Sequence, residues 1–213
     1  MAQRPLIVAF VAAAVLWPAP AHAERPAVCV LAFTDARPVK TPASVPYQVR
    51  AGDAPEPIRA HPREGTQAVR RVVLRALAAE TTIEVVDLAE ADPQRLVEDL
   101  RLARCAVFVS GAVFHYEGTV AVDLFGGKLY TGLVGYELVA VEPGRAQLLE
   151  PPVAFAGRRQ SEVVKADEDF GTNDRQALQE WIDEAVRIAS ASLAARFVRP
   201  AAQAARRAAP APK

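Results

Sequence analysis

Residues 105–157 decide the fold, because they hold four apolar runs separated by short connections. The runs are CAVFVSGAVFHY (105–116), TVAVDL (119–124), LYTGLVGYELVAV (129–141) and AQLLEPPVAFAG (146–157). Val, Phe and Tyr recur in them, and these residues favour β-strands. Four such runs in succession predict antiparallel strands arranged as a meander.

Turns are expected between these runs. Glu117-Gly118 is predicted to turn the first hairpin, and Pro143-Gly144 supplies the two central residues of a type II turn. The stretch Phe125-Gly126-Gly127-Lys128 lies between two strand-like runs. Because Gly-Gly-Lys indicates phosphate binding only within a longer pattern that opens a helix, we interpret 125–128 as a hairpin loop.

Upstream of the meander, strand-like and helix-like segments alternate. AVCVLAF (27–33) is typical of a strand buried on both faces. Residues 65–80 predict an amphipathic helix, 83–88 a second strand, and Asp92-Pro93 the start of a short helix. This order predicts an α+β fold with a mixed, largely antiparallel sheet of about five to six strands and two to three helices packed on one face.

The expected helix at 65–80 carries an apolar stripe and a cluster of arginines. The stripe comprises Val69, Val72, Val73, Ala76 and Leu77. Arg70, Arg71 and Arg75 are expected to point away from it. The arginines have two interpretations: a docking patch for an anionic partner, or the solvated face of the helix.

The longest expected helix runs from about Asn173 to Val198. Its apolar stripe comprises Leu178, Trp181, Ile182, Ala185, Ile188, Ala189, Leu193 and Phe197. We expect this helix to lie across the sheet and to bury Trp181. Residues 199–213 are rich in Ala, Pro and Arg, and a disordered tail is predicted there because they hold little apolar bulk.

The first 23 residues have the organisation of a secretory signal peptide. Arg4 gives a positive start, Leu6 to Leu16 an uncharged apolar core, and Ala21-His22-Ala23 a site for cleavage after Ala23. No later segment approaches the ~20 apolar residues that a membrane-spanning helix needs. The sequence therefore predicts one exported periplasmic domain, residues 24–198, with no stable transmembrane segment after cleavage.

Residues 34–64 form a long connection with six prolines, which is incompatible with a helix. It has two interpretations, a partner-binding loop or a solvated insertion. The residues that we expect to bind a partner are Asp35, Arg37, Tyr47 and Lys128. The loops at 125–128 and 158–171 are further candidates for this surface.

Cys29 and Cys105 both lie in apolar, strand-like runs. In an oxidising compartment they can form a disulfide. The alternative is two buried free thiols, since neighbouring central strands seldom offer the geometry of a disulfide. Their spacing resembles neither a zinc site nor a redox CxxC pair.

No catalytic, cofactor-binding or metal-binding residue is predicted. Beyond the signal peptide the histidines are His61 and His115, and neither accompanies a recognisable nucleophile motif. Asp167, Glu168 and Asp169 cluster, but their loop lacks the spaced ligands and central glycine of an EF-hand. An enzyme is therefore not expected.

The charge balance of the expected domain argues against nucleic acid as a partner. Residues 24–198 contain 20 Lys and Arg against 25 Asp and Glu. A mildly acidic body lacks the basic surface that binds a phosphate backbone.

Three stretches resemble a group of small bacterial envelope proteins. These stretches are VCVLAFTDARP (28–38), the segment 77–86 at the end of a helix and start of a strand, and LARCAVFVSGAVFHYEG (102–118). In the third, Cys105 stands where that group usually has an acidic residue. The group includes YajG-like lipoproteins, penicillin-binding-protein activator lipoproteins, the curli secretion lipoprotein and the amino-terminal domain of the Tol–Pal periplasmic protein.

The resemblance covers residues 27–198 and implies a small α/β domain without catalytic residues. Combined with the signal peptide, it implies a periplasmic module that binds or assembles an envelope protein or glycan. One alternative is a soluble carrier or sensor of a small apolar or lipid ligand, held between the sheet and the last helix beneath Trp181. A third, less favoured hypothesis is an envelope hydrolase that uses His115 or a pair of carboxylates.

Overall fold

A computed structural model describes residues 25–37, 62–89, 105–122, 127–142, 147–148, 151–165 and 172–208. The expected signal peptide, most of the proline-rich connection with Tyr47, the helix expected at Asp92 and the Pro143-Gly144 turn lie outside the described residues.

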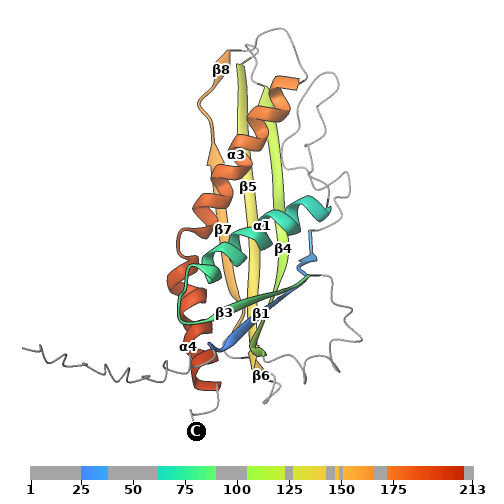
Figure 1. The fold of residues 1–213 in the computed structure, drawn as a ribbon. Helices are drawn as coiled ribbons and strands as arrows, with labels where there is room; N and C mark the ends of the chain where they lie inside the picture. The colour runs from blue at the N-terminus through green and yellow to red at the C-terminus, as the bar shows by residue number, and fades with distance from the viewer. Residues whose placement is uncertain are drawn as a thin grey trace, which may run out of the picture.

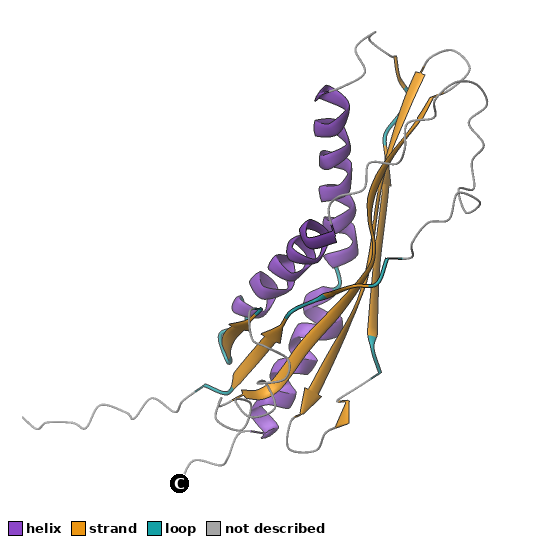
Figure 2. Cartoon of the chain, turned by 90° about the vertical axis from the view of Figure 1, so that its right-hand side faces the viewer, coloured by secondary structure: helices purple, strands orange, loops and turns teal. Residues whose placement is uncertain are grey.

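The described residues form one mixed sheet with helices on a single face (Figures 1 and 2). Its strands are β1 (Ala27–Leu31), β2 (Thr34–Asp35), β3 (Glu84–Leu88), β4 (Cys105–Val122), β5 (Gly127–Glu142), β6 (Gln147–Leu148), β7 (Val153–Gln160) and β8 (Val164–Lys165). The order runs β3-β1-β4-β5, and β7 pairs with the other side of β5. β1 is parallel to β3 and β4, whereas β5 is antiparallel to β4 and β7, which confirms the expected α+β fold.

The prediction of a turn at Glu117-Gly118 was wrong, because β4 continues straight through these residues. Gly118 is present for a different reason: a Cβ there would lie 2.9 Å from the Leu178 side chain of the long helix. The glycine therefore makes room for a helix instead of forming a bend. β4 and β5 consequently form one long hairpin in which Val122 pairs with Lys128, so Gly127 and Lys128 belong to a strand and not to a loop.

In the described part of the chain, four helical segments cover the sheet: α1 (Pro62–Ala78), α3 (Thr172–Ser190), the π-helical η2 (Ala194–Val198) and α4 (Arg199–Ala208). In Figure 1, α3 follows the upper part of the sheet, α4 the lower part, and α1 crosses between them. α1 begins three residues earlier than expected, at Pro62, since the first turn of a helix needs no N–H donor.

The predicted disordered tail is corrected for residues 199–208, which form α4. Ala201, Ala202, Ala204 and Ala205 of this helix are buried. Alanine is the best helix former, and its small side chain lets a helix lie close to a sheet. The tail therefore contributes to the core although it has little apolar bulk.

The main core lies between the sheet and the helices, and α3 approaches the sheet unusually closely. A Cβ on Gly132 of β5 would collide with the backbone carbonyl of Trp181, and one on Gly157 of β7 with that of Ala185. Only glycine permits this approach. Trp181 itself is half-buried, so the expectation that it would be buried was wrong: the backbone of α3, and not the indole, faces the sheet.

A second, smaller core cluster contains Ala27, Cys29, Cys105 and Phe108. Side chains alternate along β1, and Val28 and Val30 belong to the main core. The smaller cluster therefore lies on the sheet face that the described helices leave open.

Candidate functional site

Asp35 and Arg37, two of the expected partner-binding residues, bind each other. The guanidinium of Arg37 donates to both carboxylate oxygens of Asp35, at 2.8 and 2.7 Å, and to the backbone carbonyl of Tyr116 at 3.3 Å. This hydrogen bonding lowers the pKa of Asp35 and raises the pKa of Arg37. The pair fixes the short strand β2 beside β4.

Lys128 lies far from this ion pair and is buried, with 4% of its surface exposed. It pairs with Val122 of β4, whereas Asp35 of β2 pairs with Val113. At about 3.3 Å per residue along a strand, the nine intervening steps separate the two positions by about 30 Å. Among the described residues, the structure therefore does not bring Asp35, Arg37 and Lys128 into one site.

Cys29 and Cys105 are joined as a disulfide, with their Cα atoms 5.8 Å apart. The pairing register between β1 and β4 shifts after Ala27, which pairs with Cys105. This irregularity places the two cysteines diagonally across neighbouring strands, at a separation suited to a disulfide.

Arg70, expected to point to solvent, is instead buried, and it joins α1 to the ends of two strands. Its guanidinium donates to the backbone carbonyls of Leu31 and Val30, at 2.9 and 3.0 Å, and to both oxygens of Asp87. These hydrogen bonds hold the pKa of Asp87 below its usual value. Since every bond is internal, Arg70 positions α1 and does not bind a partner.

His115 lies beside Glu117 on β4. Its side chain is 46% exposed, and its Nδ1 is 3.8 Å from a carboxylate oxygen of Glu117. It lies next to Gly135, on the face of β5 opposite the helices. Among the described residues, no group of three His, Cys, Asp or Glu side chains is arranged to hold a metal ion.

A groove of about 700 Å³ runs between α1 and α3. Its walls are Ala68, Arg71, Val72 and Arg75 of α1, and Asp183, Val186, Arg187, Ser190 and Ala191 of α3 and the turn that follows it. Tyr116 of β4 also lines it. The buried side chains of Tyr116 and Val186 give the groove an apolar centre, and arginines lie on both walls.

Some polar groups of the groove already form hydrogen bonds within the protein, and others do not. Arg187 donates to both carboxylate oxygens of Glu184, at 2.7 and 2.6 Å. Burial raises the pKa of Tyr116, so its phenol stays neutral and adds no charge to the groove. Arg71 and Arg75 are exposed, and within the described part of the chain neither forms a hydrogen bond or an ion pair.

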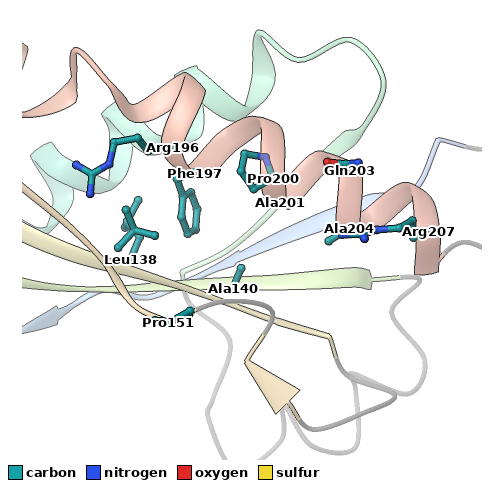
Figure 3. Close-up of a pocket in the computed structure, with 11 residues that line it drawn as sticks. Leu138, Ala140, Pro151, Arg196, Phe197, Pro200, Ala201, Gln203, Ala204 and Arg207 are labelled. Carbon is teal, nitrogen blue, oxygen red and sulfur yellow. The ribbon is translucent and has the colours of Figure 1, made fainter.

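A smaller pocket of about 120 Å³ lies between α4 and the sheet (Figure 3). Its apolar lining comprises Leu138 and Ala140 of β5, Pro151, Val153, Phe197, Pro200, Ala201 and Ala204. Its polar lining comprises Arg196, Gln203 and Arg207. The guanidinium of Arg196 lies 5.1 Å from the centre of the Phe155 ring. Since a cavity of roughly 150 Å³ holds benzene, this pocket accommodates a group of similar or smaller size.

The sequence indicated some of the residues that line the groove between α1 and α3, and none of those that line the pocket under α4. Arg71 and Arg75 belong to the arginine cluster, and their spacing of four residues places them on one face of α1. The contribution of α3 depends on tertiary packing and left no separate signal. The pocket was missed because α4 was expected to be disordered.

No family model matches this sequence, and no curated protein matches it. Its structure is similar to that of protein XCC0632 from Xanthomonas campestris, of the family DUF330, with a TM-score of 0.50. The two sequences are 15% identical, and the similarity covers 89% of this chain and 94% of that chain. Lipoprotein GNA1162 from Neisseria meningitidis is 12% identical over 74% of this chain and 94% of that one, with a TM-score of 0.39. The dodecamer of a PelC variant from Paraburkholderia phytofirmans is 13% identical over 80% of this chain and 88% of that one, with a TM-score of 0.40.

The similarity to the Xanthomonas protein establishes a shared fold and nothing more specific. Among the helices that the structure describes, none has the length and apolar character needed to cross a membrane.

Proposed function

We propose that this chain is a non-catalytic, exported binding or assembly module of the bacterial cell envelope. Its partner is another envelope component, a protein or a glycan. The signal-peptide pattern supports export to the periplasm, and the resemblance of residues 27–198 to small envelope proteins supports the role.

The observation that carries this proposal is the groove between α1 and α3. It combines an apolar centre with two exposed arginines that have no partner among the described residues. Charged groups at the edge of an apolar surface guide association and select partners. By contrast, Asp35, Arg37 and Lys128 are held within the fold, so we place the binding surface on the helical face.

Photo-crosslinking in the envelope tests this function. A photoreactive amino acid replaces Ala68 or Ala191 at the groove, and Arg158 serves as the control on the opposite sheet face. We expect one recurrent adduct from both groove positions and none from the control position. The same adducts from all three positions, or no adduct from the groove, would contradict the proposal.

The pocket under α4 favours a second candidate function, a carrier or sensor of a small apolar ligand. We place this ligand under α4 and not beneath Trp181, because the backbone of α3 lies directly against Gly132 there. Native mass spectrometry of the full chain purified from the envelope would reveal a bound small molecule, and Ala204→Phe would remove it by filling the pocket. No bound mass on the native chain, or the same bound mass on both proteins, would eliminate this candidate.

A further inference from the structure

We propose that the groove between α1 and α3 receives an amphipathic, acidic helix of a partner protein. The apolar stripe of that helix lies on the centre of the groove, and its Asp or Glu side chains meet Arg71 and Arg75. This inference rests on the proposed function, because it names the chemistry of the partner that the groove would bind.

The residues that line the groove recur at helical spacing on both walls. Ala68 and Val72 lie four residues apart on α1, and Val186 and Ser190 lie four residues apart on α3. Rows of side chains at this spacing form the ridges between which another helix packs. A helix that enters such a groove uses apolar residues at intervals of three and four.

The charges of the groove select an acidic occupant. Arg71 and Arg75 lie on the α1 wall and Arg187 on the α3 wall, against one lining carboxylate, Asp183. Asp183 already accepts a hydrogen bond of 2.8 Å from Gln179, and Arg187 is held by Glu184. The two arginines of α1 are therefore the groups available to carboxylates on the partner.

The shape and chemistry of the groove favour a helix over a glycan or a lipid. Its aromatic residue, Tyr116, is only 4% exposed and offers no ring face on which a sugar could stack. The space is an open trough between two helices, whereas a lipid chain requires an enclosed apolar cavity. A third helix would complete the layer that α1 and α3 begin.

Fluorescence anisotropy with a synthetic peptide tests this inference. The probe has about 18 residues, a length suited to a short helix, with Leu at helical spacing and Glu on both flanks. One control peptide replaces every Glu with Lys, and another has the same composition with the Leu spacing scrambled. We expect the acidic amphipathic peptide to bind the full chain at least tenfold more tightly than either control.

Matched variants of the protein locate the binding site. Arg71→Glu with Arg75→Glu should weaken binding of the acidic peptide at least tenfold, since both arginines are exposed on the wall of the groove. Arg206→Glu with Arg207→Glu makes the same charge change on α4 and should leave binding unchanged. Absence of binding, or equal loss in both double variants, would overturn the inference.

The crosslinking experiment separates this inference from the proposed function. Fragment mass spectra of the adducts from Ala68 and Ala191 identify the residues they join. Adducts within an acidic amphipathic segment support both proposals. A recurrent adduct with a glycan, a lipid or a segment without acidic residues would preserve the proposed function and refute the acidic helix.

Discussion

Arg70 and Arg71 are adjacent in sequence and have opposite roles. Arg70 passes beneath α1 and satisfies two strand-end carbonyls and the carboxylate of Asp87. Arg71 lines the open groove. Successive residues on a helix are about 100° apart, so one arginine can enter the core while its neighbour faces the groove.

Arg70→Met is expected to lower the free energy of unfolding by about 2–3 kcal/mol, because it leaves the carbonyls of Val30 and Leu31 without their donors. Arg71→Met is the matched control and should change it by less than about 0.5 kcal/mol. Urea unfolding followed by circular dichroism measures both. Equal effects of the two substitutions would show that the hydrogen bonds of Arg70 do not stabilise the fold.

The ion pair of Asp87 predicts a loss of stability in acid. Hydrogen bonds from Arg70 lower the folded pKa of Asp87 below its ordinary value of 3.8. The pair therefore contributes fully above that value, and its contribution is lost as the pH falls through the lowered folded pKa. Asp87→Asn should reduce the fall in urea midpoint between about pH 5 and about pH 2. An unchanged pH profile would exclude this contribution.

At the scale of elements, two glycines of the sheet allow α3 to lie directly against it. Gly132 and Gly157 lie on neighbouring strands directly under the helix backbone, at Trp181 and Ala185. The hydroxyl of Tyr136 lies 2.9 Å from that of Ser190 near the end of α3. Together these contacts fix the position of α3, and hence one wall of the groove.

Gly132→Ala is expected to destabilise the fold by about 2–3 kcal/mol, because the added methyl group must displace the backbone of α3. Gly135→Ala is the matched control on the opposite face. There the methyl group meets the Cδ2 atom of His115 at 3.0 Å, and that exposed side chain can move aside. Thermal unfolding compares the two, and similar melting temperatures would contradict the close approach of α3.

The packing of α4 against the core can be tested in a similar way. Ala202 is 1% exposed against the main core, whereas Gln203 is exposed. Ala202→Asp places a charge in the core and should cost at least about 3 kcal/mol. Gln203→Asp should cost less than about 1 kcal/mol. If chemical unfolding finds both substitutions neutral, residues 199–208 do not pack as a helix in solution.

At the scale of the whole molecule, the sheet separates two apolar clusters. The larger lies under the helices, and the smaller surrounds the Cys29–Cys105 disulfide on the opposite face. The disulfide closes a long stretch of chain, since its cysteines are 76 residues apart in sequence. It therefore ties β1 to β4 across all of α1 and β3.

Replacing both cysteines with alanine is expected to lower stability by about 4 kcal/mol, because the unfolded chain regains the freedom of a 76-residue loop. A reducing agent should lower the unfolding midpoint of the native chain and leave that of the double variant unchanged. Equal midpoints of the native chain with and without reductant would show that the disulfide does not stabilise the fold.

The sequence by itself determined the class of fold. The apolar runs at 27–33, 83–88 and 105–157 predicted strands, and the 3.6-residue periodicity at 65–80 and 173–198 predicted helices. These patterns are local, because each element must present an apolar face to a common core. The order of the elements then implied the mixed sheet with helices on one face.

Tertiary structure alone decided which residues are buried and which line the groove. Gly118 looked like a turn because sequence does not reveal a helix packing above it, and Arg70 looked solvated because its acceptors lie on β1 and β3. Alanines that seemed too small to fold became buried where a sheet lay close enough to cover them. Such outcomes depend on contacts between distant segments, and the groove between α1 and α3 exists only once those contacts form.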